Sequence, residues 1–363
     1  MNETRIRTWA DTIGAALDAV GSQVTPEGDS RWTFTLTNPT VIELRKSASE
    51  TKAVFPLSSD EGGGEGRGEE LGFNEFPVAP TLSPLVPRGA REFKRNVHSS
   101  LISTAAPTNR GSRLVRAKIA GDWLALEADF CQSPNAPAKG PAFFGDLLVR
   151  NATLPGLVKF VITTDGSVWL CADLPLHEGI DIAARIREAC TGFVSAWTGE
   201  PTDPAASSAT DSPGTADDEP INLKQICAEA GWPFVERASG KLAVELEVAN
   251  GFYQALLVPT GRGVQITCDL ATCDAAPPVS RQAISGLLLA ASRAVRLGRA
   301  AIAPGEVPPV ARFEVVFAGA PCPLELASAL ESLSVACSHC GEEINLLQDH
   351  AVAQRYLELR GWT

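Results

Sequence analysis

Four residues near the end of the sequence, Cys337, Ser338, His339 and Cys340, have types and spacing that could bind a metal ion. A structural zinc site needs four Cys or His ligands, usually supplied as two such pairs. Only one pair is present. Cys337 and Cys340 also continue the apolar stripe of a helix that starts near Leu326, and a buried cysteine packs as a small apolar residue. We therefore interpret both cysteines as core residues, with a metal site as the alternative.

The histidines suggest no catalytic arrangement. A nucleophilic triad needs a His beside a Ser or Cys and a carboxylate, and no Gly-x-Ser-x-Gly elbow is present. The run Gly62 to Gly64 is followed by acidic residues instead of the Lys and Ser or Thr of a phosphate-binding loop. We expect no catalytic residue and no cofactor, which favours a non-enzymatic protein. The alternative is a hydrolase or metal enzyme whose site is assembled from scattered residues.

The composition indicates a globular chain that avoids nucleic acid and membranes. Its 363 residues are 44% hydrophobic and 20% charged, enough for two modest cores. The net charge is -12 and the basic residues are scattered, whereas a phosphate-binding surface needs them clustered. No apolar run reaches the roughly 18 residues of a membrane span. Nine cysteines, an odd number, do not suit a disulfide framework, and we expect a cytoplasmic protein.

Two segments divide the chain. Residues 200–220 are rich in Pro, Ser, Thr, Asp and Glu, so they lack the apolar surface that would offset the entropy of ordering them. Residues 57–112 contain a glycine cluster and several prolines that interrupt helix and strand. We therefore predict a first unit over 1–199 with an insertion near 57–112, a disordered acidic linker over 200–220, and a second unit over 221–363.

The two units have the same predicted order of elements, which indicates a duplication. Apolar residues at helical and strand periods predict helix, three strands, helix, two strands and helix in each half. In the first half the runs are residues 6–20, 31–37, 114–119, 123–130, 142–149, 158–162, 168–171 and 182–197. In the second half they are residues 221–230, 242–248, 253–258, 264–270, 284–288, 295–302, 312–317 and 326–340. The predicted fold class is α+β, with an antiparallel sheet and helices in each unit.

This α-β-β-β-α-β-β-α order resembles the class I type III secretion chaperones and the related YbjN proteins. The run Leu147 to Leu154, a hairpin, Leu174-Pro175 and a final amphipathic helix are similar to the second half of a YbjN-type domain. The resemblance implies a module that holds a partner polypeptide without a cofactor. Because a dimer-forming fold in tandem can satisfy its interface within one chain, we expect a monomer that forms an internal pseudo-dimer. A homodimer is the alternative, and a purely structural or regulatory tandem is a further interpretation.

Two tryptophans mark the candidate partner-binding surface. Trp123 and Trp169 lie in strands whose two faces are both apolar, so the face that does not pack on helices needs a cover or a ligand. One interpretation is that this face packs on the second unit or on the insertion. The other is that it binds an extended peptide.

Overall fold

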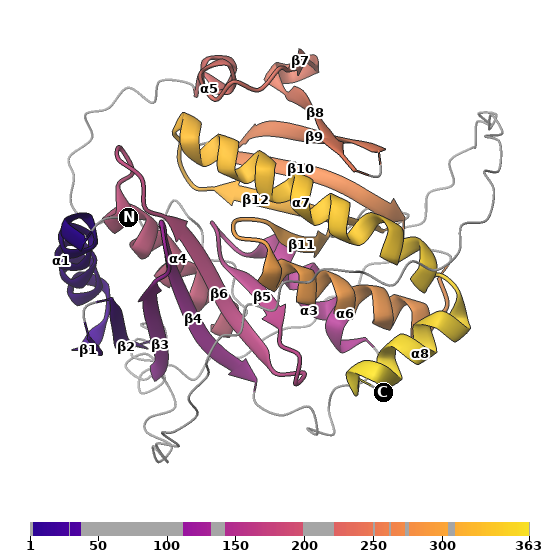
Figure 1. Ribbon diagram of the computed structural model, residues 1–363, viewed down its shortest axis with the longest axis horizontal. Helices are drawn as coiled ribbons and strands as arrows, with labels where there is room; N and C mark the ends of the chain where they lie inside the picture. The colour runs from indigo at the N-terminus through magenta and orange to yellow at the C-terminus, as the bar shows by residue number, and fades with distance from the viewer. Residues whose placement is uncertain are drawn as a thin grey trace, which may run out of the picture. The chain divides into compact units, whose positions relative to one another are not determined.

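The computed structural model describes residues 3–28, 30–37, 112–131, 142–198, 221–249, 251–260, 263–272, 276–303 and 309–362 (Figure 1). The described parts of both halves belong to one compact unit. The predicted linker, 200–220, and all of the predicted insertion except Ser112 lie outside the described residues. The domain boundaries placed there therefore stay a prediction.

The described part of the first repeat is an antiparallel sheet with three helices. Its elements are α1 (Glu3–Val20), β1 (Ser22–Pro26), β2 (Arg31–Thr37), β3 (Ser112–Ile119), β4 (Trp123–Cys131), α3 (Phe143–Thr153), β5 (Lys159–Ile162), β6 (Val168–Pro175) and α4 (Ile182–Thr198). The sheet order is β1-β2-β3-β4-β6-β5. Helix α4 contacts β2 and β6 and packs beside α1, so both helices cover the inner face of the sheet. Phe34, Leu126 and Phe193 are fully buried in the core between them.

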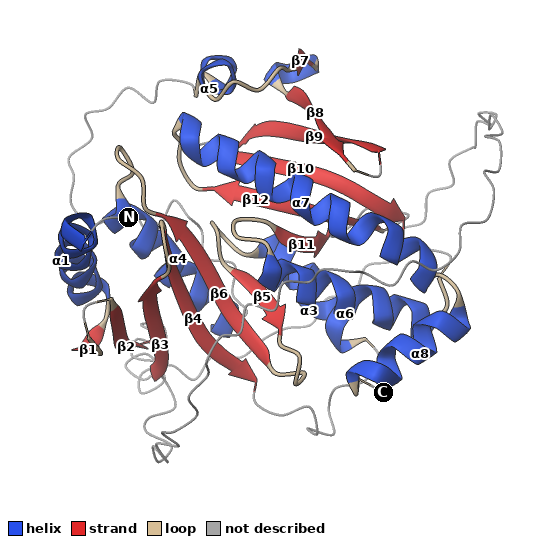
Figure 2. Cartoon of the chain, viewed as in Figure 1, coloured by secondary structure: helices blue, strands red, loops and turns tan. Residues whose placement is uncertain are grey.

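The second repeat has the same topology. Its elements are α5 (Leu223–Glu229), β7 (Val235–Glu236), the short 3-10 turn η2 (Ala238–Gly240), β8 (Leu242–Val248), β9 (Gly251–Thr260), β10 (Gly263–Thr272), α6 (Pro278–Ala294), β11 (Arg299–Ile302), β12 (Val310–Phe317), α7 (Pro323–Leu347) and α8 (His350–Arg360). The sheet order is β7-β8-β9-β10-β12-β11, the counterpart of the first sheet strand for strand. Helix α7 lies across this sheet and contacts β8, β9, β10 and β12 (Figure 2).

The register of the two sheets matches as well as their order. One row of paired residues crosses the first sheet at Thr25, Thr33, Arg116, Glu127, Cys171 and Lys159. The corresponding row crosses the second sheet at Val235, Ala243, Leu256, Thr267, Glu314 and Arg299. Equal order and equal register confirm the α+β class and support the tandem arrangement predicted from the sequence. Within the described helices, none is long and apolar enough to cross a membrane.

The structure corrects the predicted element order in three places. Among the described residues, each repeat has four strands before its middle helix, because the short strands β1 and β7 add to the three predicted. Strand β1 has one apolar residue, Val24, and β7 has only two residues, so neither produces an alternating pattern. The strand predicted over 295–302 begins at Arg299, since Val295 caps α6. Finally, Asp349 accepts hydrogen bonds from the backbone of Ala351 and Val352 and starts the additional helix α8.

Candidate functional site

The two repeats contact each other through equivalent elements. Helix α3 of the first repeat packs on β11 of the second, and α6 of the second packs on β5 of the first. These contacts place the edge strands β5 and β11 at the interface. The helices themselves meet at α3 and α6, where the equivalent residues Gly145 and Gly286 stand. Each middle helix therefore packs on the edge strand of the other repeat.

Two buried cations hold this interface at equivalent positions. The ammonium group of Lys159 donates to the carbonyl oxygen of Val295, at 2.6 Å, and to that of Arg296. The guanidinium group of Arg299 donates to the carbonyl oxygens of Gly156, at 3.0 Å, and Val158, at 2.9 Å. Each cation thus binds the backbone of the other repeat in the segment between middle helix and edge strand.

Each buried cation has a carboxylate partner in its own sheet. Lys159 lies 3.2 Å from Asp173, and Arg299 lies 2.9 Å from Glu314. Burial lowers the pKa of Lys159, and the charge of Asp173 opposes that shift. A buried charge is tolerated only when it is paired and hydrogen-bonded, and both conditions are met here. These four groups therefore hold the two repeats together and offer no free acid or base.

The middle helices supply a further equivalent pair, Asn151 and Ser292. The side-chain oxygen of Asn151 accepts a hydrogen bond from the backbone N–H of Phe160, and that of Ser292 accepts one from Ala300. Asn151 also donates to the carbonyl oxygen of Ala300 in the other repeat, at 2.9 Å. The signal for this pair was present in the sequence, because Phe-Phe-Gly-Asp-Leu-Leu at 143–148 aligns with Ile-Ser-Gly-Leu-Leu-Leu at 284–289. Apolar periodicity alone does not reveal this pair of polar residues.

A second polar contact joins α4 to the start of α7. Arg185 and Glu325 form a bidentate pair with both N–O distances at 2.9 Å, and Arg185 also lies 3.0 Å from Glu188. The guanidinium group of Arg185 lies over the ring of Phe317. Glu325 also accepts a hydrogen bond from the backbone N–H of Cys322, which caps the helix. These charged groups are likewise engaged in contacts between the repeats.

The structure separates the two tryptophans predicted to form the partner-binding surface. Trp123 has the guanidinium group of Arg296, from the second repeat, 5.4 Å from its ring centre. The ring of His177 stands edge-on to Trp123 at 6.5 Å. Arg296 is held in turn by Asp173 at 3.4 Å. Trp123 is therefore covered by the other repeat.

Trp169 lies on a different part of the same outer sheet face. The guanidinium group of Arg116, on β3 of the same sheet, is 5.4 Å from its ring centre. Asp129, on β4, is the register partner of Trp169, and Leu114, on β3, is 53% exposed. Arg31, on β2, is the register partner of Lys118, which lies two residues after Arg116 on β3. We call the surface formed by Arg31, Leu114, Arg116, Lys118, Asp129 and Trp169 the Trp169 face.

The Trp169 face combines positive charge with apolar surface. Arg31 and Arg116 are exposed, although the whole chain carries a net charge of -12. Asp129 supplies the acceptor of the face: its Oδ1 atom is buried without a hydrogen-bond partner among the described residues. A buried acceptor without a partner is costly. The face therefore offers a ring, an aliphatic side chain and cations, and it also carries the carboxylates of Asp129 and of Glu127, the register partner of Arg116.

The candidate metal ligands, Cys337 and Cys340, are fully buried on the inner side of α7. The Sγ atom of Cys337 lies 3.3 Å from that of Cys268 on β10. This contact and burial raise the pKa of Cys337, and burial raises the pKa of Cys340 to about 12. Thiols so shifted stay protonated at neutral pH, and a metal ion that bound them would have to displace those protons. Among the described residues, no group of three or more Cys, His, Asp and Glu side chains could hold a metal ion.

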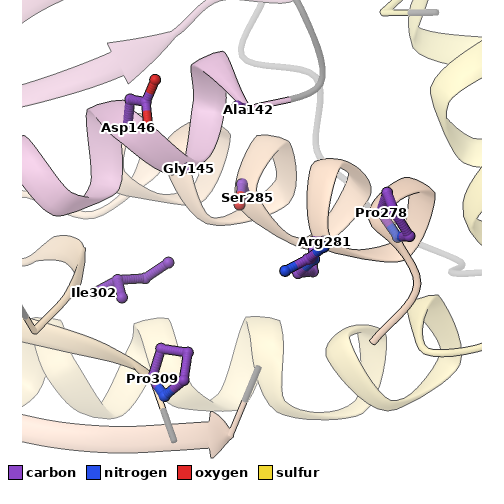
Figure 3. A pocket seen from close by; sticks show the side chains of 8 residues that line it. All are labelled: Ala142, Gly145, Asp146, Pro278, Arg281, Ser285, Ile302 and Pro309. Atoms are coloured by element: carbon purple, nitrogen blue, oxygen red, sulfur yellow. The ribbon is translucent and has the colours of Figure 1, made fainter. Parts of the chain in front are cut away.

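A cavity of about 380 Å³ opens where α3 and α6 meet β11. Figure 3 shows Gly145 and Ser285 from the two helices on one side, and Ile302 and Pro309 on the other. Apolar atoms dominate its lining, with Arg281 and Asp146 as charged residues. The cavity has no cluster of acid, base and nucleophile, so its chemistry is that of an apolar recess.

No protein-family model, curated protein or solved structure matches the chain.

Proposed function

We propose that this chain is a non-enzymatic binding protein that holds an extended segment of a partner polypeptide on the Trp169 face. The proposal keeps the chaperone-like role that the element order suggested. The partner segment has acidic and apolar residues, because the face joins basic side chains to Trp169 and Leu114. Positive charge on a protein of net charge -12 steers acidic partners toward one place.

The observation that carries the proposal is the contrast between the two tryptophans. Both rings are partly buried, but among the described residues the guanidinium group over the Trp123 ring is that of Arg296 from the other repeat, whereas the one over the Trp169 ring is that of Arg116 from the same sheet. Leu114, on the same strand as Arg116, is 53% exposed. Burying the exposed half of Leu114 would contribute about 1 kcal/mol to binding, since full burial of such a side chain contributes roughly 1.5–3 kcal/mol. A flexible arginine over an aromatic ring can move aside, and aromatic and arginine side chains dominate many interfaces.

The test uses an array of 15-residue peptides in which acidic and aromatic content are varied independently, with binding constants then measured by fluorescence polarisation. We expect acidic–apolar peptides to bind the intact chain. Leu114→Glu and Arg116→Glu should each weaken binding by about tenfold, which corresponds to about 1.4 kcal/mol. Neither residue is buried, so the unfolding midpoint should not change.

Matched controls lie elsewhere on the chain. Phe252, on β9 of the second sheet, is 67% exposed, and Arg187 is exposed on α4. Phe252→Glu and Arg187→Glu change the same kinds of side chain by the same charge, and we expect them to leave the affinity within about twofold. Equal weakening by the controls, or the absence of peptide binding by the unaltered chain, would contradict the proposal.

We further propose that the chain is a monomer in which the repeats form an internal pseudo-dimer. The reciprocal contacts of Lys159 and Arg299 support this, because the interface is completed by equivalent elements of one chain at high effective concentration. Size-exclusion chromatography with light scattering should give 38.3 kDa, the mass of one chain. A mass of twice that value at micromolar concentration would favour the homodimer.

A further inference from the structure

A second cavity, of about 450 Å³, lies between the second repeat's helices and the first repeat's β5–β6 turn. The turn contributes Ile162, Thr163 and Thr164. The helices contribute Leu287, Ala290, Ala291, Arg293 and Ala294 from α6, His339 and Glu343 from α7, and Tyr356, Arg360 and Trp362 from α8 and its end. We call it the α8 cavity. Its volume is within the range of small-molecule sites.

Helix α8 is the element that breaks the duplication, since no described helix follows α4 in the first repeat. Its end is held firmly. Trp362 is 93% buried, with its ring edge-on to Phe144 at 5.5 Å, and its carbonyl oxygen accepts a hydrogen bond from Gln282 at 2.8 Å. Gly286 leaves room for that ring, because a Cβ atom there would lie 2.5 Å from it. Helix α8 and Trp362 thus form one wall of this cavity, and the described part of the first repeat has no counterpart of that wall.

Unpaired hydrogen-bond donors gather in this wall. Six buried side-chain polar atoms lack a hydrogen-bond partner among the described residues. Three of them, Arg293 Nη1, Tyr356 Oη and Trp362 Nε1, belong to residues that line the α8 cavity. Arg360 lies over the Tyr356 and Trp362 rings. Buried donors are costly when unpaired, so an acceptor that enters the cavity and draws these side chains toward it would offset that cost.

The charged and apolar residues of the cavity lining indicate the chemical class of that acceptor. Arg293 and Arg360 bring two cations, His339 stands beside them, and Glu343 is the one carboxylate in the lining. Ile162, Leu287 and the three alanines are the apolar aliphatic residues of the lining. A phosphate would gain little from these apolar residues, whereas an organic acid would bury its body against them. Arginine and carboxylate are also geometrically matched.

We propose that the α8 cavity binds a small organic carboxylate, with Arg293 and Arg360 holding the carboxylate and Leu287 and Ala290 contacting its apolar body. Glu127 of the first sheet lies 3.7 Å from Arg293, so the site includes a residue that also contacts the other repeat. The site is separate from the Trp169 face, and neither proposal depends on the other.

The test is calorimetric titration of the full chain with two carboxylates, benzoate and isovalerate. Two control probes each lack one half of the ligand: benzyl alcohol lacks the carboxylate, and inorganic phosphate lacks the apolar body. We expect at least one carboxylate to bind and both partial probes to bind at least tenfold more weakly. Arg360→Gln should weaken carboxylate binding at least tenfold. Arg355→Gln removes an exposed arginine that does not line the cavity from the same helix, and should leave binding within twofold.

Two conservative variants separate binding from folding. Trp362→Phe keeps the ring and removes the donor, and Ala290→Phe fills the cavity. Both variants should weaken carboxylate binding and leave the far-ultraviolet circular dichroism spectrum unchanged. Benzyl alcohol binding as tightly as benzoate, phosphate binding as tightly as benzoate, or equal weakening by Arg355→Gln would each overturn the proposal. Failure of both carboxylates to bind would also overturn it and assign the buried donors to water.

Discussion

Lys159 and Arg299 occupy the same register position in two different sheets, and each donates hydrogen bonds to backbone carbonyls of the other repeat. The carbonyl oxygens they bind correspond as well: Lys159 reaches Arg296 and Gly298, and Arg299 reaches Gly156 and Val158. A duplicated fold has therefore kept a cation at one interface position while changing its chemical type. A cation is needed at this position for a structural reason, because the carbonyl oxygens lie in a buried interface and need hydrogen-bond donors.

Replacing Arg299 with Met should destabilise the chain by about 3 kcal/mol, because breaking a buried ion pair leaves a charge uncompensated. Glu314 would retain only Arg312 and Gln265, and the carbonyl oxygens of Gly156 and Val158 would lose their donor. Urea unfolding followed by tryptophan fluorescence measures the loss. The double variant Arg299→Met/Glu314→Leu should lose less than the single one. A single-variant loss below about 1 kcal/mol would show that the pair does not hold the interface.

Gly286→Ala should destabilise the chain and Gly145→Ala should stabilise it, although the two glycines occupy equivalent positions. At Gly286 the new Cβ would lie 2.5 Å from the ring of Trp362, and overpacking of this kind costs about 1–3 kcal/mol. At Gly145 the nearest atom is the Ser285 hydroxyl oxygen at 4.0 Å, so the helix gains up to about 1 kcal/mol of intrinsic propensity. Thermal unfolding of both variants measures the difference. Equal midpoints would contradict the packing of Trp362 on α6.

The buried thiols should resist alkylation in the folded protein. Contact with Cys268 together with burial raises the pKa of Cys337, and burial raises that of Cys340, whereas Cys322 is partly exposed. We expect iodoacetamide at pH 8 to label Cys337 and Cys340 roughly a hundredfold more slowly than Cys322, since the thiolate is the reactive form. Peptide mapping by mass spectrometry resolves each site. Rapid labelling of Cys340 would place it at the surface and reopen the metal interpretation.

The Cys340 thiol should make stability depend on alkaline pH. Burial raises its pKa from the ordinary value of 9 to about 12, so between these values the folded state holds a proton that the unfolded state has released. The resulting stabilisation is complete below pH 9 and declines as pH rises toward 12. Relative to Cys340→Ala, the free energy of unfolding should fall by about 2 kcal/mol between pH 8 and pH 10.5, at about 1.4 kcal/mol per pH unit. A pH-independent difference between the two proteins would contradict the burial.

Apolar periodicity predicted the helices and most of the strands because it reports which face of each element is buried. The alternation of Leu242, Val244 and Leu246 with Glu245 and Glu247 appears unchanged in β8. Strand β1 was missed because it joins the sheet through backbone hydrogen bonds with almost no apolar side chain, and a pattern of side chains cannot report such pairing.

The candidate site was predicted only in part. Both tryptophans were expected on one surface, and their sequence neighbourhoods are alike. The structure distinguishes them through Arg296, which lies more than a hundred residues away and covers only Trp123. The α8 cavity was not predicted at all. Arg293 lies on α6, more than sixty residues before Tyr356 and Trp362 on α8 and at its end, and no sequence pattern indicates that they meet.

The sequence alone determined the class of fold and the repetition of its elements, because the local spacing of apolar residues sets which surfaces must be buried. The tertiary structure decided how the repeats share an interface, why Lys159 and Arg299 are buried, and which tryptophan ring has an arginine of the other repeat over it. Those outcomes depend on groups brought together from distant positions, where hydrogen bonding and desolvation act between residues that no local pattern connects.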